Sequence, residues 1–400
     1  MIVTISKSTA FGEIAAPPSK STAHRYLICG ALSKESEISN IDFSEDIKAT
    51  ISCLENLGAK VEIEGDTVKI GGLINNKIKS NKLFCNESGS TLRFLIPICM
   101  LKEEKITLNG TKRLFERSLS VYEDMCATQG IEFSKADTSV TVKGKMTSGR
   151  YIVRGDISSQ FISGLMLSLP LLEGESIIDI TGKSESSSYL ALTLKSLADF
   201  GVRISRIDEN TMYVKGEQAF KNRQLTVEGD YSNSAFFEAF NLIGGNVAVS
   251  GLNENSVQGD KVYKELYPLL QKGSPEIDIS DCPDLGPVLM ALAAALKGAT
   301  FTGTARLKIK ESDRGMAMAE ELAKFGCKVD VEENRIKVYP CKLVTPILPL
   351  SSHNDHRIVM AVAVLCSITG GTIYGAEAVS KSLPDFFERL KKIGVKVETR

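Results

Sequence analysis

Basic and hydroxyl-bearing side chains gather at the predicted starts of several helices in this chain of 400 residues. The clearest case is PPSKSTAHR at residues 17–25, where Lys20, Arg25 and three hydroxyl groups stand at the beginning of a helix. The N-terminus of a helix carries partial positive charge, so cations there are unfavourable unless an anion neutralises them. Helix N–H groups, hydroxyls and a Lys or Arg side chain can together hold a phosphate or a carboxylate.

The same pattern recurs at other predicted helix starts. The segments are NESGSTLR (86–93), DISSQ (156–160), KIKESDR (308–314), HNDHR (353–357) and SKSLP (380–384). A single Lys near a helix end is usually only solvated, but this repetition in a chain of net charge −1 favours anion sites. We therefore expect one or two small polyanionic substrates, held where the helix ends of two domains meet.

Two carboxylates lie in or near these segments and are candidates for acid–base chemistry. Asp284 precedes a buried helix in CPDLGP, and Glu311 lies between Lys310 and Arg314 in KESDR. Asp284 could instead be a helix N-cap, and Glu311 could complement the helix dipole in a first turn. Both structural functions are compatible with catalysis. From the residues alone, the chemistry is acid–base catalysis or group transfer on phosphorylated metabolites.

Other chemistries fit the sequence less well. TGKS at residues 181–184 is similar to a P-loop, but the required Gly is replaced by Ile177. No GxGxxG follows a predicted strand, and no nucleophile elbow supports a serine hydrolase. The three His residues (His24, His353 and His356) have no Cys or carboxylate array at metal spacing. We expect a site without metal or cofactor, in which Lys and Arg neutralise the substrate charge.

Composition narrows the choice of partners and location. The 48 basic and 49 acidic residues leave no overall basic field for nucleic acid or a membrane surface. The nine Cys show no CxxC spacing, so we expect reduced core thiols in a cytoplasmic protein rather than a disulfide or zinc framework. The first residues lack the apolar stretch of a signal peptide. The longest apolar run, residues 287–296, is too short to span a membrane.

A repeated pattern organises the chain into units. Each unit has a helical stretch, a Gly that ends the helix, and then alternating residues typical of strands. The marker glycines are Gly58, Gly130, Gly201, Gly273, Gly326 and Gly394. Apolar helices between these phrases are expected to be buried. Six units predict an α/β fold with two domains of three units, joined at EGD (228–230) and at Pro17-Pro18.

Taken in order, the motifs resemble those of the 5-enolpyruvylshikimate-3-phosphate (EPSP) synthases, of the enolpyruvyltransferase family, over essentially the whole chain. The matching stretches are PPSKSTAHR, ESGSTLRF, FERS, DISSQF, PDLGPVLM, KIKESDR, NDHR and SKSLPDFF. The resemblance implies an α/β fold of two domains, each with three βαβαββ repeats that form an inside-out α/β barrel. The active site would lie in the interdomain cleft. Residues 1–16 and 229–400 would form one discontinuous domain, and residues 17–228 the inserted domain.

The resemblance also implies a reaction. Enzymes of this family transfer the enolpyruvyl group of phosphoenolpyruvate to the 5-hydroxyl of shikimate 3-phosphate and release phosphate. The reaction passes through a tetrahedral intermediate, without a metal, in the shikimate pathway to chorismate and aromatic amino acids. We expect a monomer whose partners are these two small molecules.

The family's functional residues transfer to this chain motif by motif. Shikimate 3-phosphate would be held by Lys20, Ser21, Arg25, Ser158, Ser159, Gln160, Ser186, Asp284 and Lys310, with Tyr189 against its ring. Phosphoenolpyruvate would be held by Lys20, Gly89, Arg117, Gln160, Arg314, Arg357 and Lys381. The implied catalytic residues are Asp284 as the base for the 5-hydroxyl, Glu311 as the acid toward the enol carbon, and Lys20, which would reach both substrates.

Some positions depart from the family pattern. Arg306 stands where Asn is often found, and Ser118 replaces a Pro. The Gly89 segment reads GSTLR where many members have GTAMR or GTTMR. One alternative is UDP-N-acetylglucosamine enolpyruvyl transferase, which typically has Lys-Asn in place of Lys20-Ser21 and a reactive loop Cys. A second is a non-catalytic anion-binding protein on the same scaffold, which intact Asp284 and Glu311 argue against.

Overall fold

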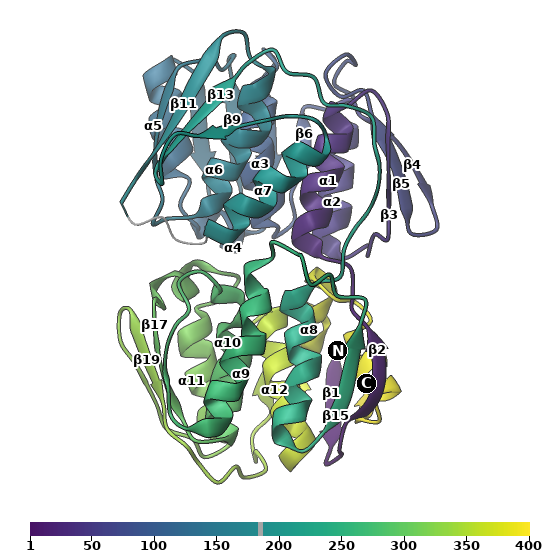
Figure 1. Ribbon diagram of the computed structural model, residues 1–400, viewed down its shortest axis with the longest axis vertical. Helices are drawn as coiled ribbons and strands as arrows, with labels where there is room; N and C mark the ends of the chain where they lie inside the picture. Colours follow the sequence, from purple (N-terminus) through teal and green to yellow (C-terminus); the bar gives the residue numbers. More distant parts are fainter. Residues whose placement is uncertain (183–186) are drawn as a thin grey trace. The chain divides into compact units, whose positions relative to one another are not determined.

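The structure, a computed structural model, describes residues 1–182 and 187–400 (Figure 1). The chain forms two compact units, each with its own hydrophobic core. The terminal unit contains Met1–Pro17 and Gly229–Arg400, and the inserted unit contains Pro18–Glu228. Both chain ends therefore belong to the terminal unit, where β1 (Ile2–Ser6) pairs antiparallel with β22 (Lys396–Thr399).

The inserted unit is built from three βαβαββ repeats, and each repeat supplies one four-stranded sheet. In every sheet the first two strands are parallel and the last two add antiparallel to them, in the orders β14-β3-β5-β4, β6-β7-β9-β8 and β10-β11-β13-β12. The strands are β3 (Ser36–Ser39), β4 (Lys60–Glu64), β5 (Thr67–Gly71), β6 (Lys82–Phe84), β7 (Ile106–Asn109), β8 (Glu132–Ala136), β9 (Ser139–Lys143), β10 (Arg150–Arg154), β11 (Glu175–Thr181), β12 (Ser205–Arg206), β13 (Thr211–Lys215) and β14 (Gln224–Thr226). The first repeat thus borrows β14 from the end of the unit, which closes it.

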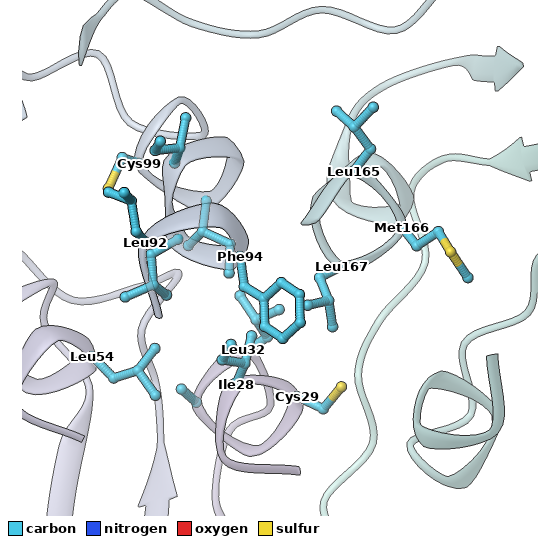
Figure 2. Packing of buried hydrophobic residues seen from close by; sticks show 14 of the residues in the cluster. Ile28, Cys29, Leu32, Leu54, Leu92, Phe94, Cys99, Leu165, Met166 and Leu167 are labelled. Atoms are coloured by element: carbon cyan, nitrogen blue, oxygen red, sulfur yellow. The ribbon is translucent and has the colours of Figure 1, made fainter. Parts of the chain in front are cut away.

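Helices of the inserted unit enclose one apolar core. They are α1 (Lys20–Leu32), α2 (Glu45–Asn56), α3 (Gly89–Cys99), α4 (Lys112–Glu116), α5 (Ser120–Gln129), α6 (Ser159–Ser168) with the 3₁₀ turn η1 (Leu169–Leu171), and α7 (Ser187–Asp199). Figure 2 shows Ile28 of α1, Phe94 of α3 and Leu167 of α6 packed together. The expected burial of these apolar helices is confirmed, since nearly every residue of α1, α3 and α6 is inaccessible.

The terminal unit repeats this plan with one shortened repeat. Its sheets have the orders β16-β17-β19-β18 and β20-β21-β1-β22, and a two-stranded parallel sheet pairs β15 with β2. The strands are β2 (Phe11–Ala15), β15 (Asn246–Ser250), β16 (Glu276–Asp278), β17 (Ala299–Thr302), β18 (Val329–Val331), β19 (Arg335–Val338), β20 (Leu350–Ser351) and β21 (Gly371–Tyr374). The helices are α8 (Tyr231–Glu238), α9 (Tyr263–Lys272), α10 (Gly286–Ala295), α11 (Arg314–Lys324), α12 (His356–Thr369) and α13 (Phe386–Lys392). The 3₁₀ turns are η2 (Ala239–Ile243), η3 (Gly259–Val262), η4 (Pro283–Leu285), η5 (Ala305–Ile309) and η6 (Ala376–Lys381).

The shortened repeat explains one wrong prediction about the marker glycines. Five of them have positive φ at a helix end as expected; Gly273 also ends its helix, as the C-cap of α9, but its φ is −168° and it is extended. No antiparallel hairpin follows α9, because β16 pairs instead in parallel with β17 of the next repeat. The chain therefore needs no left-handed residue to reverse direction at Gly273.

The prediction that all nine cysteines are reduced is wrong for one pair. Cys327 and Cys341 form a disulfide, with Cα atoms 5.4 Å apart. The hairpin of β18 and β19 pairs Val329 with Val338 and so brings its two flanks together. The other cysteines are free and buried: Cys29, Cys53, Cys85, Cys99, Cys126, Cys282 and Cys366.

Within residues 1–182 and 187–400, no helix is long and apolar enough to cross a membrane.

Candidate functional site

The buried helices of the two units begin with different capping residues. In the inserted unit, Ser19, Ser88 and Ser158 cap α1, α3 and α6 through their hydroxyls. In the terminal unit, α8, α11 and α12 are capped by the carboxylates of Asp230, Asp313 and Asp355. A serine cap satisfies one N–H group and leaves the positive end of the helix without an anion, whereas an aspartate cap supplies one. The helix starts of the inserted unit therefore match the predicted anion cradles better than those of the terminal unit do.

Lys20 is the first residue of α1 and is held by a carboxylate that the sequence did not reveal. Its Nζ donates to Asp46 Oδ2 at 2.8 Å, and both side chains are largely buried. Asp46 lies in the first turn of α2, where an acidic residue looks like an ordinary dipole complement. The cation that appeared unfavourable in the sequence is thus partly neutralised by its neighbour on α2.

Arg25 is buried one turn deeper in α1 and links it to α7. Its guanidinium donates to Thr193 Oγ1 at 2.8 Å, Ser21 O at 2.8 Å and Tyr189 O at 3.2 Å. Burial lowers the pKa of Arg25 to about 10, so the guanidinium stays charged at neutral pH. Arg25 therefore brings the backbone of the predicted residues Ser21 and Tyr189 together.

Gln160, at the start of α6, is joined to α3 by two hydrogen bonds. Its Oε1 accepts from Arg93 Nη1 at 2.8 Å, and its Nε2 donates to Ser90 Oγ at 3.0 Å. Arg93 also donates to the carbonyl of Ser118 at 3.2 Å, so the departure from Pro at 118 preserves a main-chain contact. Ser158 and Ser159 are buried beside Gln160 at the same helix start.

Gly89 and Arg117 lie in direct contact. A Cβ atom built on Gly89 would be 2.8 Å from Arg117 Nη1. Arg117 is buried, and its Nε and Nη1 have no hydrogen-bond partner in the structure. Two buried guanidinium nitrogens without a partner are costly and indicate a place for an anion. The remaining predicted residue of the inserted unit, Ser186, lies outside the described residues.

The terminal unit gathers most of its predicted residues around one guanidinium. Arg314, the first residue of α11, donates to Asp284 Oδ1 at 2.8 Å and Glu311 Oε2 at 2.7 Å. Its Nε donates to Asp355 Oδ2 at 2.8 Å. Lys310 Nζ donates to Asp284 Oδ1 at 3.1 Å, and Arg357 Nη2 lies 3.5 Å from Asp284 Oδ2. We call these six residues the Arg314 network.

The cations of the Arg314 network determine the charge of Asp284. Burial opposes its ionisation, but Lys310, Arg357 and Arg314 outweigh burial and hold the pKa of its carboxyl well below the usual range. Burial lowers the pKa of Lys310, and Asp284 opposes that effect. Asp284 is therefore an ionised carboxylate that can accept a proton, although its basicity is suppressed while three cations surround it.

The structural alternatives for the two carboxylates are not supported. Asp284 lies in η4, and the N-cap of α10 is Leu285. Glu311 precedes Asp313, the N-cap of α11, so it is outside the first turn. Both carboxylates form ion pairs with Arg314.

Lys381 lies at the end of η6 and contacts the segment that leads into the Arg314 network. Its Nζ donates to the carbonyl of Asn354 at 2.5 Å, one residue before Asp355. Arg306 is buried in η5 and lies close enough to Lys310 to lower the pKa of that lysine. Asp355 and Asp46 are acidic partners of the site cations that the sequence did not predict.

One group of side chains in the described chain has ligand atoms close enough for a metal ion. Glu320, Glu321 and His353 lie within 4.8 Å of one another by these atoms. Lys324 Nζ already lies 2.9 Å from both carboxylate oxygens of Glu321. A cation therefore occupies the buried member of this group, and none of the predicted substrate ligands belongs to it.

Comparison with known proteins identifies the family of the chain. The family model described as EPSP synthase (3-phosphoshikimate 1-carboxyvinyltransferase) matches residues 6–390. The chain belongs to the EPSP synthase family. A 3-phosphoshikimate 1-carboxyvinyltransferase of Clostridium kluyveri is 39% identical, over 99% of this chain and 98% of the relative. A relative of the same name from Clostridium novyi is 40% identical, over 96% and 95%.

Solved structures agree on the fold of the EPSP synthase family. The EPSP synthase from Acinetobacter baumannii matches with a TM-score of 0.79 at 21% identity, over the full length of both chains. The enolpyruvyl transferase NikO from Streptomyces tendae matches with a TM-score of 0.78 at 14% identity, over 99% of this chain and 98% of that one. The predicted two-domain α/β fold and the enolpyruvyl transferase class are confirmed, and the UDP-N-acetylglucosamine alternative gains no support.

Proposed function

We propose that the protein transfers the enolpyruvyl group of phosphoenolpyruvate to the 5-hydroxyl of shikimate 3-phosphate and releases phosphate. This places it in the shikimate pathway, which leads to chorismate and the aromatic amino acids. The observation that carries the proposal is the position of Asp284 and Glu311 on one guanidinium, that of Arg314. A proton acceptor and a proton donor are both needed for addition across the enol double bond, and this pair supplies two carboxyl groups at one place.

The chemical steps follow from that pair. Asp284 takes the proton of the 5-hydroxyl as its oxygen bonds to the central carbon of phosphoenolpyruvate, while Glu311 delivers a proton to the methylene carbon. The resulting tetrahedral intermediate then returns a proton from the new methyl group to Glu311 and expels phosphate, which takes the proton held by Asp284. The proton balance closes because each carboxyl group returns to its starting state. Lys20 would stabilise the charge that develops on both substrates.

Binding of the two anionic substrates would also make Asp284 a stronger base. Lys310, Arg314 and Arg357 suppress the basicity of Asp284 in the structure without substrates. We expect phosphate and carboxylate oxygens to draw these cations away, which raises the pKa of Asp284 toward the value a general base needs. Substrate binding and proton removal would therefore be coupled through the same three side chains.

The remaining predicted ligands divide between the two substrates as the family resemblance suggests. Shikimate 3-phosphate would use the serine-capped helix starts, with Lys20, Ser21, Arg25, Ser158, Ser159, Gln160 and Ser186, together with Asp284 and Lys310. Phosphoenolpyruvate would use Lys20, Gly89, Arg117, Gln160, Arg314, Arg357 and Lys381. Arg117 supports this assignment because its guanidinium lies against Gly89 and has two nitrogens, Nε and Nη1, without a partner. Lys and Arg alone would neutralise the substrate charge, without metal or cofactor. A monomeric state and a cytoplasmic location remain predictions.

A coupled phosphate-release assay tests the proposal. The parent protein should release phosphate only when both substrates are present, and neither substrate alone should suffice. UDP-N-acetylglucosamine in place of shikimate 3-phosphate should give no turnover. Binding of both anions without phosphate release would instead support a non-catalytic protein on this scaffold.

A further inference from the structure

Glu321, on the buried face of α11, is unusual in having three different donors. Its carboxylate accepts from Lys324 Nζ at 2.9 Å, from the backbone N–H of Ser351 at 3.0 Å and from His353 Nε2 at 2.7 Å. The side chain is 1% exposed. Buried carboxylates are costly unless they are fully hydrogen-bonded, so this arrangement fixes each donor to α11. None of these contacts is used in the reaction proposed above.

Two of the donors belong to the turn between β20 and α12, residues 351–354. Within this turn His353 and Asn354 have φ values of 47° and 54°, in the left-handed region. Consecutive non-glycine residues in that region are strained, and they persist only where the surroundings hold them. The hydroxyls of Ser351 and Ser352 accept from the backbone N–H groups of His353 and Asn354, both at 3.1 Å. Glu321 supplies the contact that ties this strained turn to α11.

The turn presents two groups to the candidate active site. The carbonyl of Asn354 accepts from Lys381 Nζ at 2.5 Å, and the next residue, Asp355, accepts from Arg314 Nε at 2.8 Å. Asp355 also caps α12 through the backbone N–H of Arg357 at 2.9 Å. A displacement of the turn would therefore move Lys381, Arg314 and the start of α12 together.

We propose that Glu321 and His353 are positioning residues: their hydrogen bond locks the 351–354 turn and thereby orients Lys381 and Arg314 toward phosphoenolpyruvate. This inference rests on the proposed function for the substrate that these two cations bind. It does not require Glu321 or His353 to touch either substrate. The expected consequence is an effect on phosphoenolpyruvate and not on shikimate 3-phosphate.

The charge state of the pair makes the lock dependent on pH. The hydrogen bond to Glu321 raises the pKa of His353, an effect that Glu320 reinforces and that partial burial and Lys324 oppose. Burial raises the pKa of Glu321, but hydrogen bonds from His353 and Lys324 outweigh it and leave the pKa below its usual value. Both charges are thus present between the lowered pKa of Glu321 and the raised pKa of His353. Above that window the imidazole is neutral and can still donate from Nε2, but only the Glu321 carboxylate remains charged.

The test compares His353→Gln and His353→Phe with the parent at pH 6 and pH 9. The Gln side chain can donate a neutral hydrogen bond, whereas Phe cannot donate at all. At pH 6 we expect the KM for phosphoenolpyruvate to rise about fivefold in His353→Gln, because donor and acceptor are both charged in the parent, whereas the Gln donor is neutral and only the Glu321 acceptor is charged. At pH 9 the KM for phosphoenolpyruvate of the parent and of His353→Gln should agree within about twofold. His353→Phe should have a higher KM for phosphoenolpyruvate than the parent at both pH values. The KM for shikimate 3-phosphate should be unchanged throughout.

Glu320→Gln is the matched control, because Glu320 is the exposed neighbour of Glu321 and lies 3.8 Å from His353 Nε2. Exposed ion pairs contribute little, so its KM values should stay within about twofold of the parent. Melting temperatures of all variants are recorded with the kinetics. The positioning role is wrong if the KM for phosphoenolpyruvate differs between His353→Gln and the parent by the same factor at both pH values. It is also wrong if the KM values for both substrates and the melting temperature change in parallel.

A readout that does not need turnover separates the two proposals. The affinity for inorganic phosphate, obtained from the rise in melting temperature with phosphate concentration, should fall in His353→Gln at pH 6 and match the parent at pH 9. A parent that binds phosphate in this way but shows no turnover would contradict the proposed function and leave the positioning role supported. An active parent with unchanged phosphate affinity in the variant would refute the positioning role alone.

Discussion

Asp284→Asn removes one negative charge from the Arg314 network while it keeps the shape of the side chain. The carboxylate accepts from Lys310 at 3.1 Å and from Arg314 at 2.8 Å. It also lies 3.5 Å from Arg357. Arg314 keeps its contacts with Glu311 and Asp355 in the variant, so the network is weakened rather than abolished.

The expected magnitudes follow from these contacts. Hydrogen bonds to charged groups contribute about 1.5–3 kcal/mol, and Asn retains one acceptor oxygen, so the free energy of unfolding should fall by about 2 kcal/mol at pH 7. Turnover should fall by about 10²-fold or more, because Asn cannot accept the proton of the 5-hydroxyl. The affinity for phosphoenolpyruvate should hold or improve, since the three cations no longer have Asp284 as a competitor for the substrate oxygens.

The dependence on pH has a definite sign. The pKa of Asp284 is depressed in the folded protein, so its contribution to stability is present above its unfolded pKa of about 3.9 and is lost as the pH falls through the lower folded value. The difference in stability between the parent and Asp284→Asn should therefore be constant from pH 7 to about pH 5 and shrink at lower pH.

Three measurements on the parent, Asp284→Asn and Asp281→Asn would decide the matter. Asp281 is an exposed neighbour in the same segment and serves as the control. Steady-state phosphate release gives turnover and KM, calorimetry gives the affinity for phosphoenolpyruvate, and denaturant unfolding at several pH values gives stability. Turnover at saturation within about tenfold of the parent, together with a collapse of affinity, would show that Asp284 is a ligand and not the base.

Gly89→Ala should raise the KM for phosphoenolpyruvate by about 10- to 100-fold, because the new methyl group would lie 2.8 Å from Arg117 Nη1 and displace it. Gly273→Ala is the control, because Gly273 is extended and has open space around it. Equal KM values in the two variants would contradict the assignment of Arg117. Added phosphate should raise the melting temperature of the parent more than that of Lys20→Ala, and equal shifts with retained activity would remove Lys20 from the anion site. Cys341→Ser should lower the free energy of unfolding by about 3 kcal/mol if the Cys327–Cys341 disulfide closes its short loop in the purified protein; mass spectrometry of the unreduced protein that finds nine free thiols would contradict the bond.

The helix starts of this protein were predictable from sequence because they depend on local signals. Lys20, Gly89 and Arg314 were expected at helix starts, and each is the first residue of its helix. Five marker glycines were recognisable because a left-handed residue ends a helix regardless of its tertiary surroundings. Gly273 also ends a helix but is extended, because the tertiary pairing of β16 decided its conformation.

The partners of the site cations could not be predicted, because they come from distant segments. Asp46 is 26 residues from Lys20, and Asp355 is 41 residues from Arg314. Each acidic residue also has an ordinary local explanation, as a first-turn residue or as a cap. The disulfide was not predicted for the same reason, because the register of a hairpin, and not the spacing of the cysteines, brings Cys327 to Cys341.

The contrast between serine and aspartate caps has a consequence for selectivity inside a cell full of small anions. The starts of α3 and α6, capped by Ser88 and Ser158, have no carboxylate cap that a free anion such as chloride would need to displace. Arg314, in contrast, is saturated by three tethered carboxylates whose effective concentration no free monovalent ion can match. Only a ligand with several oxygens in the right places could displace them, so the terminal unit would screen metabolites by competition with its own side chains.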